Sequence, residues 1–119
     1  MPTIYGISSC ETCRQARKWL DEHEIDYKFH NLREDGINIQ ALERWCARVD
    51  WSKILNKHSL TWRKIPESDR ADMNKDKALA AMIEYPTLVK RPVLEFDEFI
   101  ALGFSADNYQ TIFANAGRL

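Results

Sequence analysis

The sequence predicts an α/β fold in which a small mixed sheet of four strands is interrupted by an inserted helical subdomain. Near the N-terminus, residues 3–7 are strand formers and the apolar residues behind Cys10 recur at helical spacing. The middle of the chain has a helical character, and the chain returns to extended structure from Thr87. We therefore expect a single domain over residues 1–119, with a core of residues 1–35 and 86–119 and a helical insert of residues 36–85.

Cys10 stands in the turn where the first helix is expected to begin. Unpaired backbone N–H groups and the positive end of the helix dipole would face its sulfur and favour the anionic form. A free thiol has a pKa near ~8.5, and lowering it by about two units at a helix N-terminus makes thiolate the majority form. The sequence thus predicts Cys10 as a nucleophile.

Cys13 follows one helical turn after Cys10 and is the candidate resolving cysteine, placed to attack a mixed disulfide or to close a bond with Cys10. A C-x-x-C pair next to a βαβ pattern is a thioredoxin-like redox signature in an intracellular chain. Two unreactive buried cysteines are the alternative, since free Cys is often a small core residue. A zinc site would need a second Cys/His pair, which Cys46 and the three histidines do not form, so we expect no metal.

Composition and charge favour an ordinary globular protein, with 45% hydrophobic and 29% charged residues. A formal net charge of −1 argues against direct nucleic-acid binding. No apolar run approaches the ~18 residues of a membrane span. The odd count of three cysteines and the lack of a secretory signal predict the reducing cytoplasm.

Residues 24–30 alternate apolar and polar side chains, which predicts a second strand parallel to the first. A loop is expected over residues 31–36. Cys46 is expected on the buried stripe of the first helix of the insert. The insert is expected to contain helices at residues 38–49, 51–55, 67–70 and 74–85, with an extended or turn link at 61–66.

Residues 93–96 and 99–102 are expected to pair as a hairpin around the turn Asp97-Glu98. Pro92 precedes a strand that would lie centrally in the sheet, where proline cannot donate a hydrogen bond. A cis Arg91–Pro92 bond in a tight bend would explain its position.

A closing helix is expected after this hairpin. Ser105 or Asp107 would cap its N-terminus with a side-chain oxygen. Its buried face would be formed by Tyr109, Ile112 and Phe113.

In this order and spacing, the motifs resemble the arsenate reductase (ArsC)/Spx family of thioredoxin-like proteins, and most closely its YffB branch. The matching segments, which together extend along the whole chain, are residues 5–10, 16–20, 61–64, 90–92 and 102–105. The resemblance implies a thioredoxin-like fold with a four-stranded mixed sheet. It also implies that Cys10 is the redox nucleophile, that Arg91 lies beside it and that Pro92 is cis.

A guanidinium at Arg91 would stabilise the Cys10 thiolate and hold a carboxylate or oxyanion of the substrate. Arg91 is therefore expected to act both in catalysis and in substrate binding, the alternative being a surface ion pair. Lys64 and Arg14 are further candidates for an anion-binding rim, and Pro92 is expected at the substrate site.

The resemblance implies a thiol-disulfide oxidoreductase with glutathione as co-substrate and no bound cofactor. The Cys10 thiolate would attack an oxidised or glutathionylated sulfur, and glutathione or Cys13 would resolve the mixed disulfide. We expect the protein to act as a monomer.

Three alternatives stay open. One is an Spx-like regulator that binds RNA polymerase and uses Cys10 and Cys13 as its redox switch. Another is arsenate reduction, although that branch of the family uses three arginines and only Arg91 matches one of them. The third is an inert thioredoxin-like scaffold, because fold does not imply function.

Overall fold

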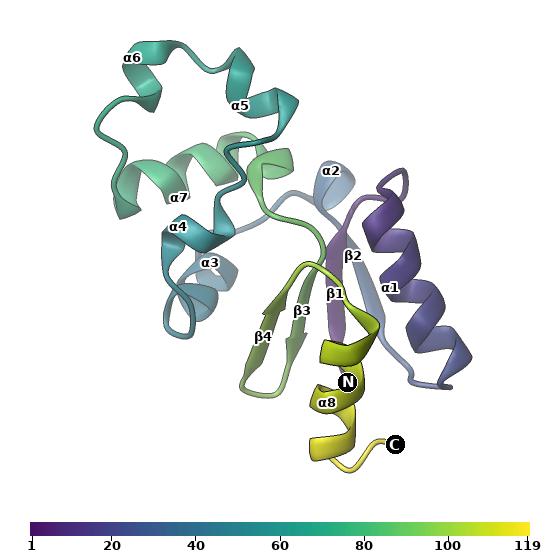
Figure 1. The fold of residues 1–119 in the computed structure, drawn as a ribbon. Coiled ribbons are helices and arrows are strands. Elements are labelled where there is room, and N and C mark those ends of the chain that lie inside the picture. The colour runs from purple at the N-terminus through teal and green to yellow at the C-terminus, as the bar shows by residue number, and fades with distance from the viewer. The chain divides into compact units, whose positions relative to one another are not determined.

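The computed structural model describes residues 1–119 and contains four strands, eight α-helices and one short 3₁₀ helix. The chain divides into two compact units (Figure 1). We call residues 1–31 and 91–119 the sheet unit, and residues 32–90 the helical unit. That the two fold as a single domain, with the insert at 36–85, stays a prediction.

The sheet unit contains one mixed sheet with the strand order β2-β1-β3-β4. The central strand β1 pairs in parallel with β2 and antiparallel with β3, and β3 pairs antiparallel with β4. This confirms the expected four-stranded mixed sheet. The strands span Thr3–Gly6 (β1), Lys28–Asn31 (β2), Val93–Phe96 (β3) and Phe99–Leu102 (β4).

The strand expected over residues 24–30 begins only at Lys28, because the end of helix α1 (Glu11–Glu22) occupies the residues before it. Glu24 has a φ of 56°, which a strand does not accommodate. Its N–H bonds to the Asp21 carbonyl at 3.1 Å, and the Ile25 N–H bonds to the Leu20 carbonyl at 3.0 Å. This pair of bonds closes the last helical turn, so the periodic pattern there belongs to a helix end.

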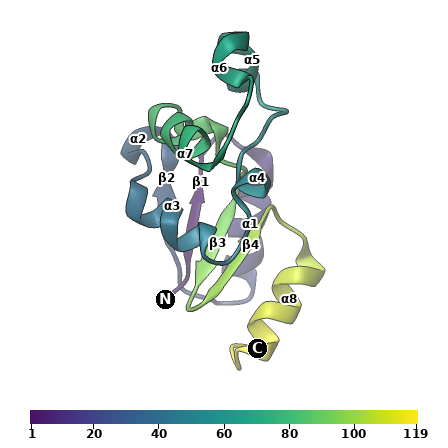
Figure 2. The same cartoon turned by 90° about the vertical axis from the view of Figure 1, so that its left-hand side faces the viewer.

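Helices α1 and α8 (Ala106–Asn115) cover the same face of the sheet, as Figure 2 shows. Trp19 of α1 packs against Tyr109 and Phe113 of α8, with ring centroids 5.6 and 5.8 Å apart. The strands contribute Ile4, Leu94 and other fully buried side chains to this core. Burial of these aromatic and aliphatic side chains holds α1 against the sheet. The first turn of α1 therefore lies next to the end of β1.

The closing helix begins as expected at Ser105, whose hydroxyl accepts a hydrogen bond from the Asn108 N–H at 3.0 Å. Tyr109 and Phe113 are fully buried, whereas Ile112 is only half-buried. The predicted cis bond between Arg91 and Pro92 is also present.

The helical unit buries its own set of apolar side chains, among them Trp45, Ile54 and Met82. Side-chain oxygens of Asn38, Asp50, Ser59 and Asn74 cap four of its helices. Its elements are α2 (Leu32–Asp35), α3 (Ile39–Cys46), α4 (Trp51–Ile54), α5 (Leu60–Lys64), α6 (Glu67–Arg70), α7 (Lys75–Glu84) and the 3₁₀ helix η1 (Pro86–Leu88).

Two segments expected to lack helix are helical in part. The predicted loop at 31–36 contains α2, and the predicted link at 61–66 contains most of α5. The hydroxyl of Ser59 accepts a hydrogen bond from the Trp62 N–H at 3.2 Å, and the helix buries the Trp62 ring. Capping and tertiary burial together outweigh the weak local propensity of these short segments.

The helix expected over 38–49 ends at Cys46, and its buried face is formed by Ala41, Leu42 and Trp45. The prediction that Cys46 is a core residue was wrong, because this side chain is only half-buried. Burial of the large Trp45 ring rotates the helix away from the stripe that would contain Cys46.

Candidate active site

Cys10 is the N-cap residue of α1, directly after the turn that follows β1. Its N–H donates to the Ile7 carbonyl at 3.1 Å, and its carbonyl accepts from the Arg14 N–H at 3.0 Å. The first bond closes the turn and the second opens the helix. This confirms the predicted strand, turn and helix, and it leaves a half-buried sulfur at the helix N-terminus.

The pKa of Cys10 is lowered from its ordinary value. Partial burial opposes ionisation, but the Cys13 backbone N–H, the Cys13 thiol and the Arg91 guanidinium outweigh it. The contact from the Cys13 N–H falls short of a regular capping hydrogen bond, so it acts as a dipole near the sulfur. Cys10 is therefore the cysteine that this fold prepares as a thiolate.

Arg91 reaches Cys10 because the two central strands present their ends at the same edge of the sheet. Tyr5 of β1 pairs with Val93 of β3 in antiparallel register. The residues just after β1 therefore lie next to those just before β3. The Arg91 guanidinium stabilises the Cys10 thiolate both by hydrogen bonding and by its charge. The structure thus brings together Cys10, Cys13 and Arg91, three of the residues singled out from the sequence.

Cys13 is the third residue of α1 and is fully buried. Burial raises the pKa of its thiol to about 12, and the neighbouring Cys10 adds to the rise, against opposing contributions from the Ile7 N–H and Arg91. All three cysteines are free thiols. Two sulfurs one helical turn apart therefore have opposite preferences, one for the thiolate and one for the thiol.

The remaining predicted residues have different surroundings. Arg14 is exposed, and its guanidinium donates to the Ser8 carbonyl at 3.2 Å and contacts the Glu11 carboxylate at 3.4 Å. Pro92 is buried, and its carbonyl accepts a hydrogen bond from the Gly103 N–H at 2.9 Å. Lys64 is the exposed last residue of α5, in the helical unit. The substrate-binding roles of these residues stay predictions.

Sequence reasoning missed three residues around the two sulfurs. Asn31, at the end of β2, donates from its amide to the Ser8 hydroxyl at 3.3 Å and so holds the turn before Cys10. Gly6 lies against the Cys13 sulfur, and the Tyr109 hydroxyl is buried without a hydrogen-bond partner. Only Gly6 carried a signal, because a glycine inside a strand often marks a close approach.

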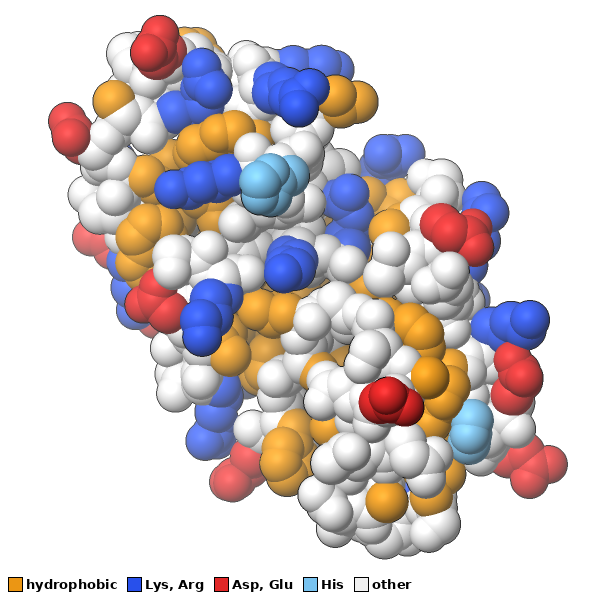
Figure 3. Space-filling model, in the orientation of Figure 1, with side chains coloured by type: hydrophobic (Ala, Val, Ile, Leu, Met, Phe, Trp, Pro, Cys, Tyr) orange, Lys and Arg blue, Asp and Glu red, His pale blue; other side chains and the backbone are white.

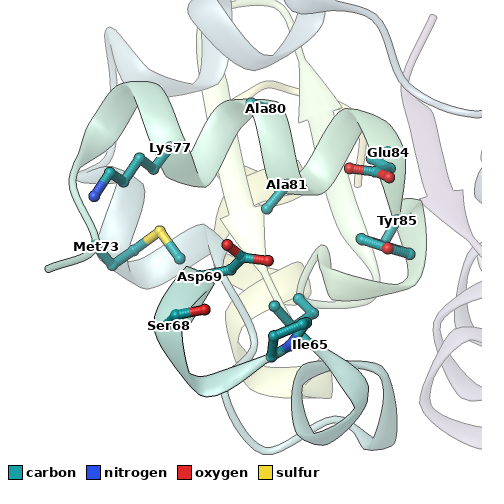
Figure 4. Close-up of a pocket in the computed structure, with 10 residues that line it drawn as sticks. Ile65, Ser68, Asp69, Met73, Lys77, Ala80, Ala81, Glu84 and Tyr85 are labelled. Carbon is teal, nitrogen blue, oxygen red and sulfur yellow. The ribbon is translucent and has the colours of Figure 1, made fainter. Parts of the chain in front are cut away.

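A separate cavity of about 420 Å³ lies within the helical unit (Figure 4). Asp69 of α6 and Lys77 and Glu84 of α7 line it together with small and apolar side chains, and none of the predicted site residues does. Figure 3 shows Lys and Arg side chains over the helical unit. Residues 51–66 contain Lys53, Lys57, Arg63 and Lys64 and no acidic residue.

Two further observations concern metal binding and membrane-spanning helices. No group of three or more His, Cys, Asp or Glu side chains is arranged to hold a metal ion. None of the helices combines the length and the apolar character needed to cross a bilayer.

Comparisons with known proteins show which family the chain resembles. It matches the ArsC family over residues 5–112. An uncharacterized protein of Haemophilus influenzae is 39% identical over 114 residues, which cover 96% of this chain and 100% of that protein. The global transcriptional regulator Spx of Enterococcus faecalis is 30% identical over 109 residues, which cover 90% of this chain and 82% of Spx.

A solved structure of a YffB protein is 40% identical and matches with a TM-score of 0.89, covering 93% of this chain and 97% of that chain. The matched part of the chain therefore includes residues of both the sheet unit and the helical unit. The four-stranded mixed sheet with α1 and α8 on one face is the thioredoxin-like fold. Taken with the Cys10 turn and the cis Pro92, these matches show that the chain belongs to the ArsC/Spx family and, within it, to the YffB branch.

Proposed function

We propose that this protein is a glutathione-dependent thiol-disulfide oxidoreductase in which the Cys10 thiolate is the nucleophile. The observation that carries the proposal is the contrast between the two sulfurs: the pKa of half-buried Cys10 is lowered, whereas that of buried Cys13 is raised. A single activated and accessible thiolate is what attack on a disulfide requires.

The proposed reaction has two exchange steps. The Cys10 thiolate attacks the glutathione sulfur of a glutathionylated thiol, forms a Cys10–glutathione disulfide and releases the substrate as a thiolate. A second glutathione thiolate then attacks this mixed disulfide, forms oxidised glutathione and regenerates the Cys10 thiolate. In the net reaction one external glutathione thiolate and the glutathione carried by the substrate leave together as oxidised glutathione, and the substrate is released as its thiolate.

Charged donors support binding of glutathione, which carries two carboxylates. The Arg91 guanidinium lies beside the Cys10 sulfur, where it would both favour the thiolate and orient an incoming carboxylate. Arg14 and Lys64 are the further cations assigned to this role. A protein that uses glutathione in this way would act in the reducing cytoplasm, as a monomer.

The first test is capture of glutathione by the purified protein. The wild type, Cys10→Ser and the control Cys46→Ser are incubated with oxidised glutathione and examined by intact mass spectrometry. We expect one glutathione adduct on the wild type and on Cys46→Ser, and none on Cys10→Ser. Turnover of a glutathionylated peptide with reduced glutathione should follow the same order. An adduct that persists in Cys10→Ser, or no turnover by the wild type, would refute the proposal.

A second candidate function is transcriptional regulation, as the name of the Enterococcus relative suggests, with RNA polymerase as the expected partner. The observation that favours it is the 30% identity to Spx over 90% of this chain, together with the second cysteine at Cys13. Binding to RNA polymerase that differs between oxidised and reduced protein would support it. Arsenate reduction is less favoured, since Gly103 and its neighbours provide no cation for a third arginine position.

A further inference from the structure

A further cavity, of about 320 Å³, lies in the sheet unit where a turn joins α1 to β2. This turn is visible at the lower right of Figure 1. None of Cys10, Cys13 and Arg91 lines the cavity, so the reaction proposed above does not use it. The lining side chains come from α1, from the turn and from β2, and they are Arg17, Asp21, Ile25, Asp26, Tyr27 and Phe29.

The half-buried Arg17 guanidinium is held toward the β2 side of this cavity by two contacts. Its central carbon lies 4.0 Å from the centroid of the Phe29 ring, and its Nε donates to the Tyr27 hydroxyl at 3.1 Å. A guanidinium has five N–H donors, so four remain on the two terminal nitrogens. No hydrogen bond or ion pair within the protein uses these four donors. The cation is therefore preorganised while its charge is unpaired.

An ion pair with Asp21 is what helical spacing would ordinarily give Arg17, because residues four apart are neighbours on a helix surface. The structure contains no such pair, since the guanidinium is turned toward Phe29 and Tyr27 instead. The carboxylates of Asp21 and Asp26 are exposed and also lack an ion-pair partner. One fixed cation and two carboxylates thus border the same cavity without pairing directly.

This charge arrangement selects against ligands with a single charge. A simple anion at Arg17 would face the two carboxylates, and a simple amine at the carboxylates would face Arg17. A ligand that carries both charges close together satisfies both sides. The volume of about 320 Å³ is at the small end of ligand sites and accommodates a molecule of amino-acid size.

We propose that this cavity binds an α-amino-acid head group, in which a carboxylate and an ammonium are attached to one carbon. The carboxylate pairs with the terminal nitrogens of Arg17, whose planar fork suits bidentate contact. The ammonium pairs with Asp21 or Asp26. A free amino acid and the γ-glutamyl end of glutathione both carry this head group. Binding here does not need Cys10, so the inference is independent of the proposed reaction.

Amide NMR titration of the whole protein tests the inference. The probes are L-glutamine, a free amino acid, and S-methylglutathione, which has no free thiol to react with Cys10. Each is added up to about 10 mM, a range that detects weak binding. We expect shifts centred on residues 17–29 and on the Arg17 Nε–H, and the tighter of the two probes identifies the source of the head group. Shifts with neither probe, or shifts centred on Cys10, would overturn the inference.

Single-charge probes and variants separate this site from general surface charge. Propionate and propylamine should each bind at least about tenfold more weakly than the tighter probe, as should the probe itself to Arg17→Gln. Lys18→Gln and Glu22→Gln remove exposed charges of α1 that do not line the cavity, and they should bind like the wild type. Equal binding by Arg17→Gln and Lys18→Gln would overturn the inference.

Two features keep this test decisive. The single-charge probes are measured on the wild type, so that comparison does not depend on the folding of Arg17→Gln. The double variant Asp21→Asn/Asp26→Asn should weaken the zwitterionic probe and leave propionate no weaker. Because neither probe reacts with Cys10, a negative result here leaves the glutathione-adduct test of the proposed function unaffected.

Discussion

The Cys13 sulfur rests against the backbone of Gly6, so closely that a Cβ atom at Gly6 would stand 2.6 Å from it. Gly6 is the last residue of β1, and Cys13 lies in the first turn of α1. The missing side chain at Gly6 therefore sets how near the helix N-terminus can come to the strand. The distance of Cys10 from the sheet therefore depends on how closely α1 approaches β1.

Gly6→Ala is expected to destabilise the protein by about 1–3 kcal/mol, because the added methyl overpacks a site that has no free volume. Urea denaturation measures the free energy of unfolding directly. The double variant Gly6→Ala/Cys13→Ala removes the opposing sulfur and should recover a large part of the loss. Equal losses in the single and double variants would contradict the contact as the cause.

Arg91→Ala is expected to raise the pKa of Cys10, because it removes the guanidinium that stabilises the thiolate. The alkylation rate of Cys10 at neutral pH should fall about threefold to tenfold. Arg91→Lys keeps the positive charge but lacks the planar guanidinium, so its alkylation rate should lie between those of the wild type and Arg91→Ala.

Arg14→Ala is the matched control for Arg91. The Arg14 guanidinium is exposed, binds the Ser8 carbonyl and Glu11, and is not among the groups that lower the pKa of Cys10. Its alkylation profile should match that of the wild type. A shift of equal size in both variants would mean that general surface charge, not the placed guanidinium of Arg91, activates the thiol.

Ser105→Ala is expected to lower the free energy of unfolding by about 1 kcal/mol, since the Asn108 N–H loses its cap. Helix α8 carries Tyr109 and Phe113 into the core of the sheet unit, so fraying of its first turn loosens that core. Thermal denaturation provides the measurement, with Gln110→Ala as an exposed control in the same helix. A loss no larger than that of the control would argue against the cap.

The raised pKa of Cys13 predicts a loss of stability at alkaline pH. In the unfolded chain this thiol releases its proton near its ordinary pKa of 9.0, whereas the folded protein holds it to about pH 12. Between these values the unfolded state binds fewer protons, so the free energy of unfolding falls as pH rises, by at most about 1.4 kcal/mol per pH unit. Below pH 9 the contribution is fully present.

Cys13→Ala should lack this alkaline slope, and urea denaturation of both proteins between pH 8 and pH 10.5, roughly bracketing the ordinary pKa, would reveal the difference. The lowered pKa of Cys10 acts in the opposite sense, but only below pH 9. Cys46 and Tyr109 also have raised pKa values and are present in both proteins, so the difference between the two curves is what reports Cys13. Parallel curves for the two proteins across that range would show that the Cys13 thiol ionises as readily when folded as when unfolded.

Local chemistry made much of the sheet unit predictable. The strand before Cys10, the cap at Ser105 and the cis bond before Pro92 each depend on one or two residues with strong conformational preferences. The helical unit was harder. Its short helix α5 forms because Ser59 caps it and Trp62 is buried, and burial of that ring depends on distant parts of the unit.

The candidate active site was likewise predictable only in part. The C-x-x-C pattern and the helix start were enough to predict an activated Cys10, and the family resemblance placed Arg91 next to it. What separates the roles of the two cysteines is the burial of Cys13 against Gly6, and that depends on the three-dimensional meeting of β1 with α1. No periodicity in the sequence reports how deeply one sulfur of such a pair is buried.

The two residues that form the activated thiolate enter the chain at very different times. During synthesis, Cys10 leaves the ribosome with β1 and α1, whereas Arg91 and the neighbouring strand β3 follow only after the whole helical unit. A nascent chain therefore exposes Cys10 without its guanidinium and without the antiparallel partner of β1. The stabilisation of the Cys10 thiolate by Arg91 therefore arises only when the final segment of the sheet unit pairs with the first.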